Sequence, residues 1–177
     1  MIVPTYILGF LIRFGPQHGY RLKQLLSENA ADFTRIKLPT IYYHLEKMQQ
    51  TGLVTVSEER KGNKPERAVY EITGTGRKEF ERLLTILLNH PCEFVFEQDA
   101  VLYFDEFLKA ELVIPSLTRQ KEKIERIIQH IEEHQNEVLP QMALQFQKKA
   151  QLIFTHHLLH YQAELKWIQN AIEVFQE

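Results

Sequence analysis

The feature that most constrains this chain is the run of residues 36–73, which reads as a helix, a turn and a two-stranded hairpin in immediate succession. Apolar side chains in its first part recur at steps of three and four, so they form one face of a helix that packs against a core. Gly52 then ends the helix, because glycine readily adopts the left-handed conformation that a helix end requires. The apolar positions are Leu38, Ile41, Leu45 and Met48 in the helix, and Val54, Val56, Val69 and Ile72 in the strands.

The other face of this helix, together with the basic hairpin tip, predicts an interface for double-stranded DNA. Hydroxyl, amide and cationic groups line that face, and the major groove is wide enough to admit a helix that carries them. Tyr42 lies on the flank, so it either packs in the core or places its hydroxyl on a phosphate. The alternative is a merely solvated basic surface. The expected DNA-binding residues are Lys37, Thr40, Tyr42, Tyr43, His44, Lys47, Arg60, Lys61, Lys64 and Arg67.

These motifs resemble the winged helix-turn-helix of PadR-type transcriptional regulators over roughly the first 85 residues. That family often has a proline where this chain has Tyr43, a difference that bears on the bases read rather than on the fold. The resemblance implies a homodimeric, usually repressing, ligand-responsive DNA binder of a bacterial or archaeal cytoplasm. Such regulators respond to phenolic acids and to planar or cationic drugs. The matching segments are Tyr6–Leu11, Gly15–Leu22, Thr40–Leu45, Gly52–Val54 and Arg67–Arg77, with a weaker similarity at His160–Ile168.

Charge is divided unequally along the chain. The formal net charge of the whole chain is -2. Residues 1–88 hold 13 Lys and Arg against 9 Asp and Glu, a balance of +4, whereas residues 89–177 hold 8 against 14, a balance of -6. This difference disfavours a uniformly mixed surface without excluding it, and it places the positive charge in the half that carries the hairpin.

The sequence predicts a cytoplasmic protein that does not enter the membrane. The single cysteine, Cys92, excludes an intrachain disulfide and fits a reducing compartment. The apolar run 7–12 does not fit a secretory signal, because Pro4 precedes it, Arg13 interrupts it and no basic segment comes before it. No stretch approaches the roughly 18 apolar residues that a membrane span needs.

The expected fold is mainly α with a small β-wing: a winged helix-turn-helix domain at residues 1–89 and an α-helical dimerisation domain at residues 90–177. Helices are expected at about 5–14, at 19–29 with Tyr20 partly buried, and at 73–88. Asn89-His90-Pro91 breaks the pattern and marks the boundary. The segment 94–112 is so densely apolar that it should lie between other elements.

Two long helices are expected next, at 116–138 and at about 141–175, separated by Pro140. Leu117, Ile124, Ile131 and Val138 form a seven-residue seam on the first. The second carries two apolar stripes, so it needs two partners: the first helix and a second subunit. A monomeric helical hairpin is the alternative. The expected dimer-interface residues are Phe154, Leu158, Tyr161, Leu165, Ile168 and Ile172, and the other stripe comprises Phe146, Ile153, His160 and Trp167.

Histidines are the only other candidates for chemistry. His130 and His134 have metal-ligand spacing, but their charged surroundings favour ordinary solvated histidines. The cluster at 156, 157 and 160 allows a metal site, a pH sensor, an effector pocket or plain interface polar groups. We expect no metal and no cofactor. We also expect no catalysis, because phosphate-loop and nucleophile-elbow motifs are absent. His160 and Trp167 are the candidate residues for a small aromatic effector, although Trp167 equally fits a subunit seam.

The sequence therefore predicts a dimeric, sequence-specific regulator that binds an operator in double-stranded DNA, as a repressor relieved by a small-molecule effector. Two alternatives remain at this stage. One is a protein-interaction module that uses the winged helix as a scaffold and the C-terminal helices to bind a protein partner. The other is an enzyme built on the histidine cluster and a metal.

Overall fold

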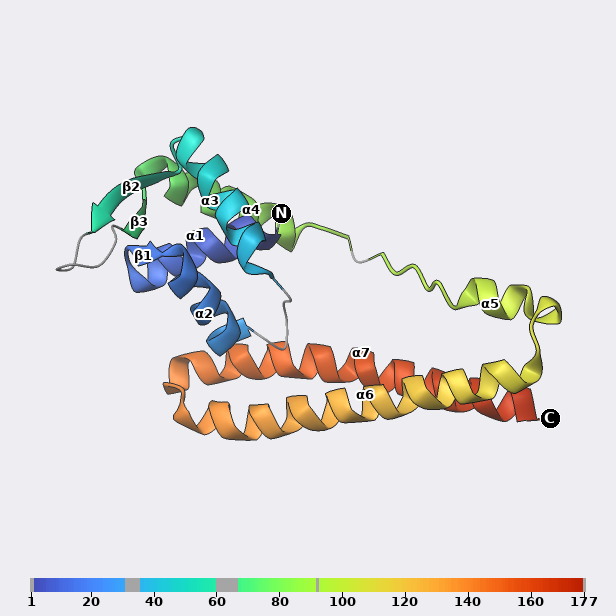
Figure 1. Cartoon of the computed structure of the whole chain (residues 1–177). Coiled ribbons are helices and arrows are strands. Elements are labelled where there is room, and N and C mark those ends of the chain that lie inside the picture. Colours follow the sequence, from blue (N-terminus) through green and yellow to red (C-terminus); the bar gives the residue numbers. More distant parts are fainter. Residues whose placement is uncertain (1, 31–35, 60–66, 92, 177) are drawn as a thin grey trace. The chain divides into compact units, whose positions relative to one another are not determined.

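The structure, a computed structural model, describes residues 2–30, 36–59, 67–91 and 93–176 (Figure 1). The chain divides into two compact units, residues 1–93 and residues 94–177. We call them the N-terminal unit and the helical unit. The expected helix break at Asn89 is seen, because α4 ends at Leu88 and no helix resumes before Asp99 in the described residues.

The N-terminal unit combines helices with a small antiparallel sheet in which β3 lies between β1 and β2. Tyr70 of β3 pairs with Val56 on one side and with Gln17 on the other. The expected fold class, mainly α with a small β-wing, is confirmed. The elements are α1 (Ile2–Phe14), β1 (Gln17–His18), α2 (Gly19–Ala30), α3 (Leu38–Gln50), β2 (Val54–Glu59), β3 (Arg67–Ile72) and α4 (Gly74–Leu88).

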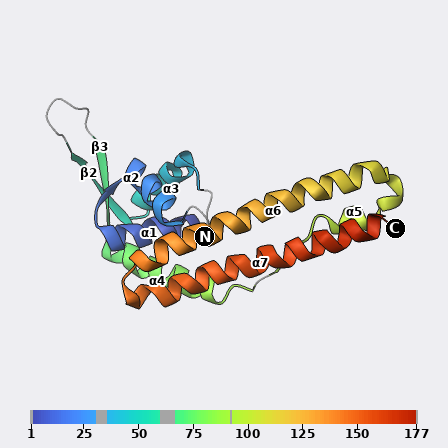
Figure 2. The ribbon, with the colours of Figure 1, turned by 90° about the horizontal axis from the view of Figure 1, so that it is seen from below.

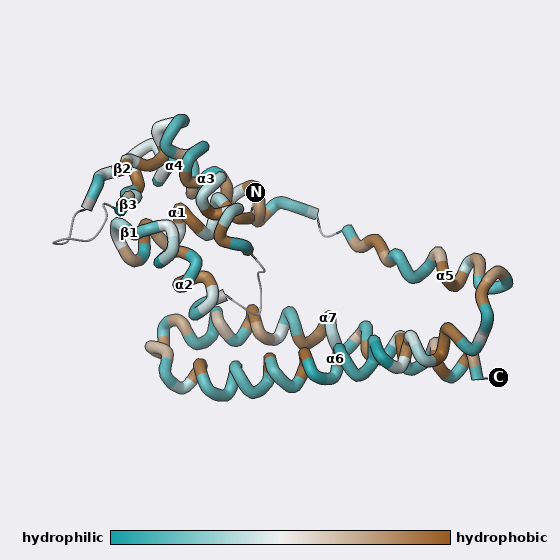
Figure 3. Tube along the Cα trace, in the orientation of Figure 1, coloured by the Kyte–Doolittle hydropathy of each residue, from teal (hydrophilic) through white to brown (hydrophobic). Residues whose placement is uncertain are grey.

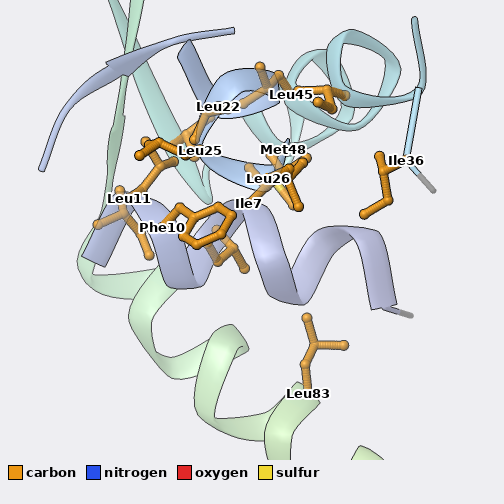
Figure 4. Packing of buried hydrophobic residues seen from close by; sticks show 14 residues of the cluster. Ile7, Phe10, Leu11, Leu22, Leu25, Leu26, Ile36, Leu45, Met48 and Leu83 are labelled. Atoms are coloured by element: carbon orange, nitrogen blue, oxygen red, sulfur yellow. The ribbon is translucent and has the colours of Figure 1, made fainter. Parts of the chain in front are cut away.

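The core of this unit gathers apolar side chains from α1, α2, α3, α4 and the strands (Figure 4). Ile41, Leu45 and Met48 of α3 point into it, as their spacing predicted, whereas Leu38 is half-buried. Each large side chain buried in this way contributes roughly 1.5–3 kcal/mol, so the stripe fixes how α3 is rotated about its axis. The polar side of the same helix is consequently held outward.

Gly52 and Thr73 fix the joint between α3, the wing and α4. Gly52 has a φ of 71°, the left-handed conformation that the sequence predicted at this turn. The Thr73 hydroxyl accepts a hydrogen bond from the Gly76 N–H at 3.0 Å and donates one to the Gly52 carbonyl at 2.8 Å. One side chain therefore caps α4 and ties its first turn to the end of α3.

The helical unit consists mainly of two long helices that lie side by side, α6 and α7, preceded by the short α5 (Figures 1 and 2). The break that Pro140 predicted falls in a short 3-10 turn between them. No helix within the described ranges has the length and apolar character needed to cross a bilayer. The elements are α5 (Asp99–Tyr103), η1 (Asp105–Phe107), α6 (Ala110–Val138), η2 (Leu139–Gln141) and α7 (Leu144–Gln176).

Helix α6 begins earlier than expected and contains Pro115. Proline removes one helical hydrogen bond and normally ends or kinks a helix, so the residues before it were not expected to be helical. Val113 and Leu117, on either side of the proline, are both buried against α7. The Thr118 hydroxyl also donates to the Ile114 carbonyl at 2.8 Å. Packing on both sides of the proline thus compensates for the missing bond.

The seam between α6 and α7 is apolar with one polar layer. Ile131 of α6 and Phe154 of α7 are buried in it. On the η2 side of this pair, Gln135 donates to Gln151 at 3.4 Å, and Gln151 donates to Thr155 at 3.2 Å. These side chains are half-buried, and the Oε1 atom of Gln135 is buried without a hydrogen-bond partner among the described residues, so the layer is only partly satisfied.

The apolar segment 94–112 contradicts the sequence prediction. It was expected to lie between other elements, yet its large apolar side chains are exposed within the chain, and Figure 3 shows hydrophobic residues around α5. The reason is geometric, since α5 and η1 are short and the described helical unit provides only α6 and α7 as neighbours. The exposed residues are Phe94, Val95, Phe96, Val101, Leu102, Tyr103, Phe104, Phe107, Leu108 and Leu112.

Candidate nucleic-acid interface and helical-unit pocket

The outward side of α3 presents hydrogen-bonding and cationic groups. Tyr43 is 60% exposed, and its ring stands edge-on to that of His44 at 5.2 Å. Lys47, one turn further on, is exposed, Thr40 is half-buried, and Lys37 is exposed at the position just before the helix. This side lies opposite the buried stripe, as the three-and-four spacing predicted.

Tyr42 packs against α2 while much of its ring stays in solvent. A β-carbon placed on Gly19 would lie 2.5 Å from Cε1 of Tyr42, so the ring rests directly on the glycine backbone. The side chain is nevertheless 43% exposed. Both roles that the sequence allowed for Tyr42 are therefore compatible with its position: packing on the body of the unit and offering its hydroxyl outward.

His44 departs from the expected DNA-facing position. It is half-buried and lines a hollow of about 460 Å³ with Pro4 and Leu8 of α1 and Leu83 of α4, and the exposed Lys47 borders the same hollow. Burial lowers the pKa of His44, and nearby positive charge, including that of Lys47, lowers it further, so this position favours the neutral imidazole.

A stacked group at the base of the wing was missed in the sequence. Arg67 lies over the ring of Tyr20, with its Cζ 5.5 Å from the ring centroid, and the His18 ring stacks on the same tyrosine at 5.5 Å. Tyr20 was expected to be partly buried but is 46% exposed. Pairing of β1 with β3 brings these residues together, and a two-residue strand leaves no periodic signal.

The other expected wing cations lie outside the described residues. These are Arg60, Lys61 and Lys64.

The helical unit contains a pocket of about 410 Å³ that includes both expected effector residues, His160 and Trp167. The Phe94 ring lies 5.2 Å from the His160 ring. Aromatic walls with a few polar groups are the usual make-up of a site for a small, partly apolar molecule. The remaining lining residues are Phe96, Gln98, Asp99, Tyr161, Ala163 and Glu164.

The expected dimer-interface residues of α7 do not share one environment. Phe154 is 3% exposed and Ile168 is 0% exposed, because α6 covers them within a single chain, so neither is available to a partner subunit. Leu158, Tyr161, Leu165 and Ile172 are half-buried. The exposed apolar side chains of α7 are Leu144, Phe146, Leu152, Ile153, Leu159 and Val174.

Three features of this chain occur together: a helix α3 with an exposed polar face, a wing, and a separate pair of long helices. Together they define a winged-helix DNA-binding regulator. Residues 7–82 match the transcriptional regulator PadR-like family. A curated relative, the negative transcriptional regulator PadR of Bacillus subtilis strain 168, is 27% identical over 121 residues. The match spans 68% of this chain and 62% of the relative. These are regulators rather than enzymes, in agreement with the expectation of no catalysis.

Solved structures share the fold over nearly the whole chain. Bacillus subtilis PadR in complex with operator DNA has a TM-score of 0.77 at 22% identity, with 99% of each chain covered. The Vibrio cholerae virulence activator AphA has a TM-score of 0.77 at 23% identity, with 98% of each covered. Bacillus subtilis PadR in complex with p-coumaric acid has a TM-score of 0.69 at 24% identity, covering 99% of this chain and 96% of that one. These likenesses establish the fold.

Proposed function

We propose that the chain is a cytoplasmic, homodimeric, sequence-specific repressor whose operator affinity is set by a small aromatic ligand. The observation that carries the proposal is the outward face of α3, where Tyr43 and Lys47 stand exposed on the side away from the core. We infer repression, rather than activation, from the curated relative, which is named a negative transcriptional regulator. The shared fold alone does not decide the direction, since AphA is named an activator.

In this proposal α3 enters the major groove and the wing lies along the backbone. Tyr43 and Lys47 contact base edges, and Arg67 contacts a phosphate from its place over Tyr20. A dimer would present two such modules to half-sites about 34 Å apart, one helical turn of DNA. The C-terminal helices would then set the spacing between the modules.

A second copy of the chain is the partner that the exposed apolar surface fits. Monomeric proteins rarely leave apolar patches beyond a few hundred Å² in water. The helical unit exposes both the segment 94–112 and the outer side chains of α7, including Leu152 and Leu159. We therefore assign the dimer interface to these exposed residues, in place of Phe154 and Ile168.

The DNA-binding proposal is tested by fluorescence anisotropy with duplex from upstream of the protein's own coding region, against scrambled duplex, at several salt concentrations. Preference for the native duplex with affinity that falls steeply as salt rises would support it, because phosphate contacts release counterions. No binding to either duplex at low salt would overturn direct DNA recognition by the free protein and favour the protein-interaction alternative.

Replacing Tyr43 by alanine should reduce discrimination between native and scrambled duplex by about 1–3 kcal/mol, the worth of a good base contact. The ring is exposed, so the fold should be unaffected. Tyr43→Phe keeps the ring and removes only the hydroxyl, which separates hydrogen bonding from apolar contact. If Tyr43→Ala weakens both duplexes equally, Tyr43 positions the protein on phosphates instead.

The ligand proposal is tested by isothermal titration calorimetry with p-coumaric acid, the molecule bound to Bacillus subtilis PadR in one structure. His160→Ala should weaken binding at least tenfold, since His160 lines the pocket with both an aromatic ring and polar nitrogens. His130→Ala, on α6 and not among the pocket residues, is the control. Binding unchanged in His160→Ala would exclude this pocket. A bound ligand alters operator affinity only through its different affinities for the DNA-competent and incompetent states.

A further inference from the structure

His156 and His160 bring two imidazole nitrogens together on the surface of α7. They stand four residues apart, and one imidazole donates a hydrogen bond to the other, with the two Nε2 atoms 3.0 Å apart. A bound ion would replace the proton of this hydrogen bond. The ring centroids are separated by 4.7 Å and the ring planes meet at 77°. Both side chains are exposed, so solvent and ions can reach the pair.

This spacing matches two ligands of one metal ion. Metal–imidazole bonds of about 2.0–2.1 Å that meet near a right angle place the two nitrogens about 3.0 Å apart. We propose that His156 and His160 form a two-histidine chelate for a divalent transition-metal ion, with Cu²⁺ bound more tightly than Ni²⁺ or Zn²⁺. That order follows from the general preference of nitrogen ligands for divalent copper.

Water completes the coordination of the ion in this proposal. Among the residues that the structure describes, no group of three or more His, Cys, Asp or Glu side chains could hold a metal. The site is therefore exchangeable and open, unlike a closed four-ligand structural site. The proposal revises the expectation of no metal, which rested on sequence spacing without ring orientations.

The second histidine pair of the molecule shows that spacing alone does not create such a site. His130 and His134 are also four residues apart, on α6, but their rings are stacked. The ring centroids lie 6.3 Å apart and the planes are within 13° of parallel. Stacked rings present their faces to one another rather than two nitrogens to a common point, so this pair serves as a control. His134 also stands edge-on to Phe154 of the seam at 5.8 Å, so circular dichroism must first show that the control variant keeps its helices.

Neighbouring groups hold the chelating pair in place. α7 is continuous through both residues, and the Phe94 ring lies against that of His160 at 5.2 Å. Binding of a metal ion would therefore cost little conformational entropy beyond that of the two histidine side chains. His160 also lines the helical-unit pocket, so if that pocket takes the proposed effector, metal and effector alter each other's affinity by the same factor.

The test is a Cu²⁺ titration of the untagged full-length protein, followed by the fluorescence of Trp167, the only tryptophan. Bound Cu²⁺ should quench this residue, which lies seven residues beyond His160, about 10 Å along the helix. We expect one ion per chain. His156→Gln and His160→Gln should each weaken binding tenfold or more, because one imidazole cannot chelate. The double variant His130→Gln/His134→Gln should bind as the wild type does.

Electron paramagnetic resonance of the Cu²⁺-loaded wild type provides a readout that needs no variant. Hyperfine coupling to two imidazole nitrogens is the expected result. Coupling to one nitrogen or to none would overturn the chelate. Equal Cu²⁺ affinity in the wild type and in His156→Gln/His160→Gln would overturn it as well. Loss of binding only in the His130/His134 double variant would move the site to α6 and also contradict the proposal.

Discussion

Replacing Gly76 by alanine is expected to destabilise the N-terminal unit by about 3 kcal/mol, the upper range for overpacking a filled site. Gly76 is buried in the first turn of α4, and an added β-carbon would overlap the carbonyl oxygen of Leu53 and come within 2.8 Å of the Ile72 side chain. That carbonyl accepts hydrogen bonds from both the N–H and the hydroxyl of Thr73. It cannot move aside without opening the joint between α3, the wing and α4.

Gly74→Ala is the matched control, because Gly74 lies two residues earlier in the same turn and an added β-carbon would meet nothing within 4 Å. Alanine is also the better helix former, so the control should be neutral or slightly stabilising. Urea unfolding followed by far-ultraviolet circular dichroism measures both variants. Equal midpoints for Gly76→Ala and Gly74→Ala would show that the close approach at Leu53 does not limit the fold.

The N-terminal unit was largely predictable because its signals are local. The steps between Ile41, Leu45 and Met48 gave the inner face of α3, and hence its outer face. Gly52 marked the turn through its conformational freedom. The start of α4 was predicted to within one residue. The sequence placed Thr73 as the first residue of the helix, whereas in the structure Thr73 is the N-cap and the helix begins at Gly74.

Features that depend on distant partners could not be read from the chain. The contacts of the Tyr20 ring with His18 and Arg67 depend on β1 pairing with β3, and neither the period nor the composition of residues 17–18 shows that pairing. The two histidine pairs have the same spacing, and only ring orientation distinguishes them. Orientation is set by neighbours such as Phe94, which lies far from His160 in sequence.

Helix α7 shows the same limit for packing. Its apolar period was clear, but a period gives the existence of a stripe and not the identity of its partner. The stripe that contains Phe154 and Ile168 faces α6 within the chain. Likewise, the apolar density of 94–112 predicts that something covers it, without saying whether the cover comes from the same chain or from a second copy.

Ile168→Glu is expected to unfold the helical unit, with a loss of about 3–5 kcal/mol. The side chain is 0% exposed and packs with Val113 and Leu117 of α6, so a carboxylate there would be buried without a partner. Thermal unfolding by circular dichroism should show loss of the long helices at temperatures where the wild type is folded. A wild-type melting curve would mean that α6 and α7 do not pack through this residue.

Leu159→Glu separates dimer assembly from folding on the same helix. Leu159 is 60% exposed, so the carboxylate can remain in water and the helical content should be retained. If a second copy covers this side of α7, dimer formation would bury the charge at a cost of several kcal/mol, and the variant should be monomeric by sizing with light scattering. A monomer would also lose affinity for a two-half-site operator far more than for a single half-site. A folded dimer in both Leu159→Glu and Leu152→Glu would place the interface away from these residues and leave the segment 94–112 as the remaining apolar surface for a second copy.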